Sequence, residues 1–292
     1  MRYSSIFYSL LAACFFVFPV AHCRIGAHSA PQNTATDIEK TEIIDMETTS
    51  EDTSSSPLPP PFPTENSEFW DVNDVDISNI DRNKKLIAFT FDDAPSRTIE
   101  NILTVYAAFN EENPDCPASA TIFCNSGLFD AQSTHVLYSC LTLGIELGNH
   151  THSHYDLTTL SQPILLDEIN RTDKALFEID GKPRHLLRAP FGKADTFVKS
   201  HAPSPMIDWT IDTMDWSGVS EDAIYRSVFD NRFSGAIVLM HDGYKNTVNA
   251  LKRLLPDLKS DGYQVVSVSQ MAKAHGCTLR RGNTYIRLRK QS

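Results

Sequence analysis

The sequence predicts an α/β domain built around a parallel sheet, and two observations point to this class. After about residue 84, short apolar runs that are typical of buried strands alternate with longer segments whose apolar residues recur at helical spacing. The number of these strand–helix units suits a small (β/α) barrel, complete or incomplete, formed by one domain over residues 84–276.

The first half of this domain contains three such units. The run at 85–91 reads as a buried strand, and in the helix expected at 98–112 the apolar residues share one face. A second strand is expected at 119–124, followed by a helix at 135–144. A third strand is expected at 145–150, and a long helix that begins near Thr158 or Ser161 follows at 157–179.

The second half continues the alternation with shorter elements. Strands are expected at 185–190 and 205–212, and a helix with Ser220 as its N-cap is expected at 220–233. A sixth strand at 235–242 precedes a helix at 247–262, which Gly262 ends, and a last strand is expected at 263–268.

Residues 1–22 have the features of a targeting segment. Arg2 supplies a positive start, and the apolar run Ile6–Ala21 ends in small residues and a proline, as in a secretory signal peptide. An uncleaved signal anchor is the alternative, and a bacterial lipoprotein box at Leu11–Cys14 ranks third. We therefore expect a secreted or cell-envelope protein, attached to a membrane only through such an anchor or lipid.

Residues 23–83 are predicted to be a disordered acidic linker rich in Pro, Ser and Thr. Between Ile25 and Asn83 there are thirteen acidic and two basic residues, which accounts for the whole net charge of −11. The proline-rich stretch Ser54–Pro63 favours an extended spacer, whereas 68–77 could pack against the domain edge. The remaining charge is balanced, so we expect no nucleic-acid partner.

The end of the chain, 277–292, is predicted to be a basic tail, either a solvated hairpin or a contact for an anionic polymer. Beyond the targeting segment the sequence holds Cys116, Cys124, Cys140 and Cys277, with Cys23 depending on the cleavage point. Cysteines in an exported chain permit disulfides, and their spacing does not predict a thiolate zinc site.

Titratable side chains follow almost every predicted strand. Asp92 and Asp93 end the first strand, His150 to His154 the third, Arg188 the fourth, Asp212 and Asp215 the fifth and His241 the sixth. Because the carboxyl ends of parallel strands meet at one face, we expect these groups to form one site. Two adjacent carboxylates need a compensating cation, a metal or a shared proton.

His150 and His154 are four residues apart. If this segment winds as a helix, both imidazoles face one side and bind one ion, while His152 points elsewhere. One aspartate and two histidines leave coordination positions open for water and substrate, which is the pattern of a catalytic zinc site.

The motifs "TFDDAP", "HTHSH", "RAPFG", "DTMDW" and "LMH" occur in order between about Lys84 and Ala274. In this the chain resembles the polysaccharide deacetylases of carbohydrate esterase family 4, which act on chitooligosaccharides, chitin and peptidoglycan. The resemblance implies a metal-dependent hydrolase that removes N-acetyl groups from N-acetylglucosamine units of a polysaccharide and releases acetate. It also implies one catalytic domain with the distorted, incomplete barrel of that family.

The resemblance implies roles for ten residues. Asp93, His150 and His154 bind a divalent metal, Zn²⁺ first and Co²⁺ as the alternative. Asp92 is the general base, Arg188 orients it, and His241 is the general acid, tuned by Asp215. Trp216 and Leu239 wall the acetyl pocket, and the backbone N–H of Phe191 helps hold the oxyanion.

Three other functions stay open at this point. The same site could remove O-acetyl groups from a xylan-like polysaccharide or act as an amidase on a small molecule, because the motifs specify the reaction rather than the polymer. The fold could also serve as a non-catalytic glycan-binding module. No obligatory protein partner is evident.

Overall fold

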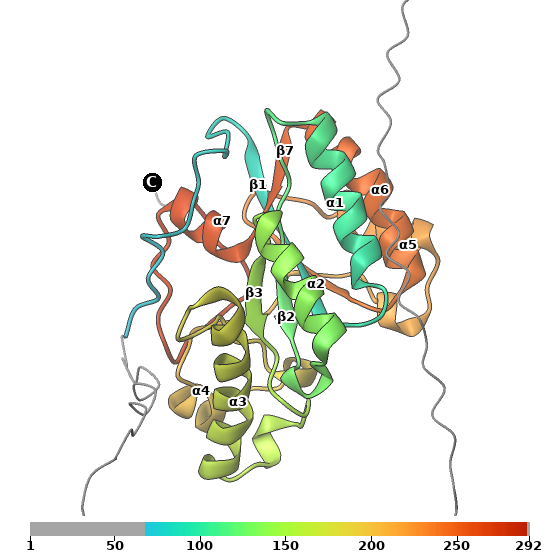
Figure 1. Ribbon diagram of the computed structural model, residues 1–292. Helices are drawn as coiled ribbons and strands as arrows, with labels where there is room; N and C mark the ends of the chain where they lie inside the picture. The colour runs from blue at the N-terminus through green and yellow to red at the C-terminus, as the bar shows by residue number, and fades with distance from the viewer. Residues whose placement is uncertain (1–67, 291–292) are drawn as a thin grey trace, which may run out of the picture. The chain divides into compact units, whose positions relative to one another are not determined.

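The computed structural model describes residues 68–290, and Figure 1 shows their arrangement. The predicted targeting segment and linker residues 23–67 lie outside this range. Within the described part, every helix is too short or too polar to cross a membrane.

A parallel sheet forms the centre of the domain and confirms the predicted fold class. The strands are hydrogen-bonded in the order β3-β2-β1-β6-β5, and β7 pairs with the first half of β1. All of these pairings are parallel. The strand bounds are β1 Lys85–Ala94, β2 Thr121–Cys124, β3 Glu146–Asn149, β4 Met206–Ile207, β5 Ile211–Asp212, β6 Ile237–His241, β7 Tyr263–Val266 and β8 Thr284–Tyr285.

Helices cover the outer side of this sheet (Figure 1). Successive contacts run from α5 to α6, α1, α2, α3 and α4, so that the helices follow the strands around the domain. The helix bounds are α1 Ile99–Glu112, α2 Ala131–Thr142, α3 Gln162–Asp180, α4 Thr196–His201, α5 Glu221–Phe229, α6 Lys245–Ser260 and α7 Val268–His275.

The alternation of side chains along β1 separates two layers of core. Ile87, Phe89 and Phe91 belong to the cluster between the sheet and the helices. Leu86 and Ala88 belong to a second cluster on the inner side, with Leu186, Ile207 and Ile237. The inner row of β1 continues through Thr90 to Asp92, and this periodicity carries the Asp92 carboxylate to the inner mouth of the barrel.

The predicted fourth and fifth strands were wrong in detail. Of the range 185–190, only Leu187 pairs, through single bridges to Asn149 and Met206. The range 205–212 divides into β4, which pairs with β8, and β5, which pairs with β6. Residues 208–210 connect β4 to β5, but these two strands are not paired with each other. The barrel is therefore distorted and open at this point.

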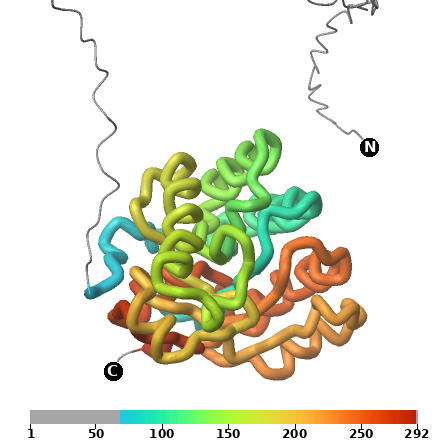
Figure 2. Tube along the Cα trace, turned by 90° about the horizontal axis from the view of Figure 1, so that it is seen from below, coloured from blue at the N-terminus to red at the C-terminus, as the bar shows by residue number. Residues whose placement is uncertain are grey.

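Segments on both sides of the predicted domain pack against it in the structure. Residues 68–83, expected in the linker, pack on the domain: Ile80 is buried, and Trp70 donates from its backbone N to the carbonyl of Leu279 at 2.9 Å. The predicted basic tail is also integrated, because β8 pairs with β4 and Leu288 is buried. In Figure 2 the first and last described segments lie on the same side of the domain.

The four described cysteines, Cys116, Cys124, Cys140 and Cys277, form no disulfide with one another. Burial raises the pKa of the Cys140 thiol to about 12 and that of Cys124 well above its usual value. These two side chains are therefore unreactive members of the apolar core at neutral pH.

Candidate active site

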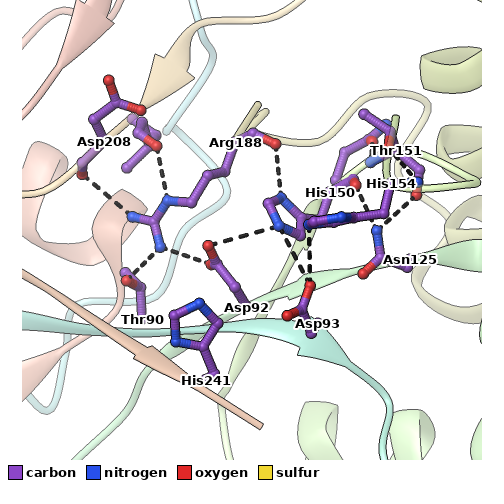
Figure 3. A network of polar contacts seen from close by, with 12 residues as sticks. Thr90, Asp92, Asp93, Asn125, His150, Thr151, His154, Arg188, Asp208 and His241 are labelled. Carbon is purple, nitrogen blue, oxygen red and sulfur yellow. Dashed lines mark hydrogen bonds and ion pairs between the residues drawn. The ribbon is translucent and has the colours of Figure 1, made fainter. Parts of the chain in front are cut away.

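Asp92 is bound by an arginine that the fold buries completely. Arg188 donates from Nη1 to Asp92 Oδ1 at 2.8 Å and to Thr90 Oγ1 at 2.6 Å (Figure 3). Its Nε donates to the carbonyl of Ile207 at 2.9 Å, and its guanidinium lies 4.3 Å from the ring centre of Phe123. This arginine supplies the positive charge that the strand end requires, and it fixes the orientation of the Asp92 carboxylate.

Asp93 faces the same site as Asp92 although the two are neighbours on one strand. In a regular strand, adjacent side chains point to opposite faces. Here Asp93 has a φ of 61°, and the pairing of β1 with β2 shifts its register between Phe91 and Ala94. This irregularity turns the Asp93 carboxylate toward the site.

Asp93, His150 and His154 form the one candidate metal centre found among residues 68–290, with ligand atoms within 4.8 Å of one another. Asp93 Oδ1 lies 3.6 Å from His150 Nε2 and 3.3 Å from His154 Nε2. His150 donates from Nδ1 to the carbonyl of Arg188 at 2.8 Å, which leaves the Nε2 lone pair directed at the site.

The donor set therefore fits a divalent metal with open coordination positions. Burial is the main cause that lowers the pKa of His154, and the neighbouring His150 is the second. This imidazole is therefore neutral and able to bind a metal at neutral pH. Two nitrogens and one carboxylate oxygen are ligands typical of zinc.

The spacing of His150 and His154 suggested that a helix brings them together, but the structure has no helix at this point. Residues 150–156 form an irregular loop, in which Thr151 and His154 have φ values of 69° and 57°. His152 lies elsewhere, as expected, with Nδ1 at 2.8 Å from Ser126 Oγ. The loop conformation, rather than helical periodicity, brings His150 and His154 together.

His241 ends β6, and the parallel register pairs it with Asp92 of β1. It donates from Nδ1 to Asp215 Oδ1 at 2.8 Å, which leaves Nε2 as its unengaged ring nitrogen. Asp215 Oδ2 also accepts from the His241 backbone N at 2.8 Å and from Thr247 Oγ1 at 2.6 Å. The Asp215 carboxylate is thus buried and held from several sides.

The surroundings of His241 act on its pKa in opposite directions. Burial lowers the pKa, while the hydrogen bond to Asp215 and the charges of Asp92, Asp215 and Asp93 raise it, and the net result is a raised pKa. A His–Asp pair of this kind favours the protonated imidazole near neutral pH.

These groups open onto a cavity of about 450 Å³. It is lined by Asp92, Asp93, His150, His154, Phe191, Gly192, Trp209, Asp212, Trp216, Leu239 and His241. Phe191 and Trp216 are 62% and 50% exposed, which is unusual for large apolar side chains and typical of a surface that stacks on a ligand. Arg188 and Asp215 lie behind the wall and contact the lining residues.

Three lining residues were not assigned to the site from the sequence. Trp209 and Gly192 lie against each other, since a Cβ added to Gly192 would stand 2.8 Å from the Trp209 ring. Asp212 was noted only as a strand-end residue. The apolar alternation around Trp209 resembles that of an ordinary core strand, so the sequence carried no signal that this ring lines a cavity.

Comparisons with known proteins agree with this geometry. The polysaccharide deacetylase family profile matches residues 79–204. The peptidoglycan-N-acetylglucosamine deacetylase PgdA of Listeria monocytogenes is 30% identical over 205 residues, which are 70% of this chain and 42% of that protein. A peptidoglycan-N-acetylglucosamine deacetylase of Bacillus cereus is 32% identical over 203 residues, which are 66% of this chain and 91% of the relative.

A solved structure extends the comparison to the fold. The peptidoglycan deacetylase PdaC of Bacillus subtilis matches with a TM-score of 0.62 and 30% identity, over 68% of this chain and 94% of that one. The full-length peptidoglycan-N-acetylmuramic acid deacetylase PdaC of Bacillus subtilis is 32% identical over 193 residues, which are 66% of this chain and 40% of the relative. The fold, the ordered motifs and these relatives place the chain in the polysaccharide deacetylase family, carbohydrate esterase family 4.

Proposed function

We propose that this protein is an exported, metal-dependent deacetylase that hydrolyses the N-acetyl group of N-acetylglucosamine units in peptidoglycan. The observation that carries the proposal is the pairing of Asp92 with His241. These two candidates for proton transfer stand in register on neighbouring strands, beside the candidate metal ligands. The similarity to peptidoglycan deacetylases supports the substrate class and a location at the cell wall.

Asp93, His150 and His154 hold the metal in this proposal, and Zn²⁺ is the first candidate for it. A divalent ion bound there polarises the acetyl carbonyl and makes a water molecule more acidic. The fixed Nδ1–H of His150 and the lowered pKa of His154 support this role, because both present a nitrogen lone pair to the ion.

Asp92 is the general base, and it takes a proton from the attacking water. Arg188 supports this role by binding Oδ1, which leaves Oδ2 3.7 Å from His150 Nε2 and beside the candidate metal centre. The backbone N–H of Phe191 is proposed to stabilise the negative oxygen that forms on the acetyl carbon. The φ of 61° at Phe191 sets the orientation of this peptide group.

His241 is the general acid. Its Nε2–H protonates the sugar nitrogen as the C–N bond breaks, and the products are acetate and a free amine. Asp215 supports the imidazolium form before this transfer. Trp216 and Leu239 line the cavity, and we propose that they form the apolar wall against which the acetyl methyl group packs.

Acetate release from three substrates tests the proposal. The purified protein, loaded with Zn²⁺, is incubated with peptidoglycan, with N-acetylglucosamine oligomers and with acetylxylan. We expect acetate and new free amines from the first two. Acetate from acetylxylan alone would assign an O-acetyl esterase, and no acetate from any polymer, with metal bound, would favour a glycan-binding module. Mass analysis of digested peptidoglycan distinguishes N-acetylglucosamine from N-acetylmuramic acid as the deacetylated sugar.

A further inference from the structure

The loop that carries both candidate histidine ligands has a costly backbone. Thr151 and His154 both lie in the left-handed region, with φ values of 69° and 57°. Thr151 is β-branched, and such residues rarely adopt this conformation. Conformations of this kind persist only where surrounding contacts determine them.

Side chains hold several of the peptide groups of this loop. Asn149 Oδ1 accepts from the Thr151 N–H at 2.8 Å, and Asn125 donates from Nδ2 to the His150 carbonyl at 2.6 Å. The hydroxyl of Thr151 accepts from the His154 N–H at 3.2 Å. The loop therefore depends on contacts from outside itself, and two of the supporting carboxylates come from α3.

Glu168 of α3 is the first of these carboxylates. Its side chain is buried, its Oε2 accepts from the Ser153 N–H at 2.7 Å, and its backbone carbonyl accepts from the His152 N–H at 3.0 Å. Glu168 therefore holds the backbone N–H of Ser153, one residue before the candidate ligand His154, from a buried position in α3.

Asp173 of α3 is the second. Its Oδ1 accepts from Asn149 Nδ2 at 2.9 Å and from His185 Nδ1 at 3.0 Å, and Arg184 Nη1 lies 3.0 Å from Oδ2. Asn149 Nδ2 also donates to the Ile169 carbonyl at 2.9 Å. These contacts fix which way the Asn149 amide points, and so direct its oxygen to the Thr151 N–H.

We propose that Glu168 and Asp173 are positioning residues of the candidate metal centre. Through Ser153 and Asn149 they hold the 150–154 loop in its left-handed turns before metal binds, so α3 sets the affinity for the divalent ion. This inference rests on the proposed function, in which Asp93, His150 and His154 hold that ion. Loss of either contact lets the loop relax and separates the two imidazoles.

Metal affinity tests this inference independently of turnover. The dissociation constant for Zn²⁺ is measured by competition with a chromophoric chelator, and the visible spectrum of the Co²⁺-loaded protein reports ligand geometry. Glu168→Ala should weaken Zn²⁺ binding by about 10–100-fold, the usual effect of removing a group that orients a metal ligand, and should change the Co²⁺ spectrum. Glu168→Gln should retain most of the affinity, because its amide oxygen accepts the same N–H.

Asn149→Ala removes the link between Asp173 and the loop. Unlike a substitution of Asp173, it keeps the carboxylate that His185 and Arg184 contact. It should weaken Zn²⁺ binding by a similar factor, and it keeps the test decisive if Glu168→Ala does not fold. Leu176→Ala is the matched control, because Leu176 is a buried residue of the same helix that packs in the outer core. It should lower the unfolding midpoint but leave Zn²⁺ affinity unchanged.

Wild-type affinity and an unchanged Co²⁺ spectrum in both Glu168→Ala and Asn149→Ala would overturn the inference and leave the proposed function standing. A comparable loss of affinity in Leu176→Ala would also overturn it, since the effect would then follow from stability alone. Absence of Zn²⁺ binding by the wild-type protein would contradict both proposals.

Discussion

Asp92 and Asp93 are adjacent in sequence, but the structure gives them different surroundings. Asp92 is bound by the buried guanidinium of Arg188, whereas Asp93 stands within 3.6 Å of both histidine Nε2 atoms. The positive φ at Asp93 makes this division geometrically possible. Each carboxylate therefore has its own proposed task, proton transfer for one and metal binding for the other.

Substitution should separate these two tasks. Asp93→Ala, His150→Ala and His154→Ala should each lose bound metal, because each removes one of the three proposed protein ligands. Asp92→Asn should keep the metal and the fold but lower kcat by about 10²–10⁴-fold, as expected for a lost general base. Metal content of the purified variants, together with acetate release, checks this. Full metal occupancy in all three ligand variants would reject the ligand set.

The His241–Asp215 pair predicts a shift in the pH–rate profile. Burial lowers the pKa of His241, but its polar contacts outweigh burial and the pKa is raised. The hydrogen bond to Asp215 is the largest contribution that raises it. Activity that requires the protonated imidazole falls as pH rises through this pKa. Asp215→Asn removes the negative charge, so the pKa should fall and the alkaline limb should move to lower pH.

The measurement for this pair is kcat/KM against pH on a soluble N-acetylglucosamine oligomer, with metal at saturation. Because Asp215 also accepts from the His241 backbone N and from Thr247, an unfolding midpoint is measured alongside to separate stability from titration. An alkaline limb that stays in place in a folded, metal-loaded Asp215→Asn protein would reject the pairing.

At the scale of elements, the segment before β1 is a structural part of the domain. Trp70 donates from Nε1 to Ser269 Oγ of α7 at 3.2 Å, and it packs with Val72 and Ile77 against the inner core cluster. The residues of this segment do not line the candidate active-site cavity. We therefore expect it to contribute to stability rather than to chemistry.

Trp70→Ala should lower the free energy of unfolding by about 2 kcal/mol, since a half-buried aromatic side chain is lost. The kcat on a soluble oligomer should not change below the unfolding transition. Denaturant unfolding and acetate release measure the two quantities, with the exposed Asp74→Ala as a control for substitution in the same segment. A large fall in kcat in the folded variant would mean that the segment reaches the substrate.

At the scale of the whole molecule, a buried ion cluster links α3 to the chain after it. His185 lies between Asp173 and Asp180, with ring nitrogens 3.0 and 3.2 Å from their oxygens. Burial lowers the pKa of His185, but the hydrogen bonds to Asp173 and Asp180 outweigh it, and the pKa is raised above 6.5. The protonated imidazole therefore stabilises the folded state.

Because this pKa is raised on folding, its contribution to stability is fully present below pH 6.5 and is lost as pH rises through the raised value. The free energy of unfolding should decrease with pH over that window. In His185→Gln this slope should be smaller, with the remaining part due to groups such as His241. Denaturant unfolding at a series of pH values measures it, and an equal slope in both proteins would contradict the assignment.

The sequence alone determined the fold class, most of the strands and helices, and the identity of the titratable groups. Apolar runs and helical spacing are local signals, and the parallel connections follow from strand–helix alternation. Asp92, His150, Arg188 and His241 could be expected at one face because the strands that they follow are parallel. The resemblance to a family then supplied the expected roles.

Only the tertiary structure decided how these groups meet. The helix expected for His150–His154 is a loop with two left-handed residues, because contacts from Asn125, Asn149 and Glu168 outweigh local preference. Trp209 lines the cavity, and β4 and β5 are separate strands. Local sequence did not predict either feature, because the partners that determine them, such as β8, are distant in sequence. Periodicity reports which side of an element is buried, whereas only contacts between distant segments determine what lies against it.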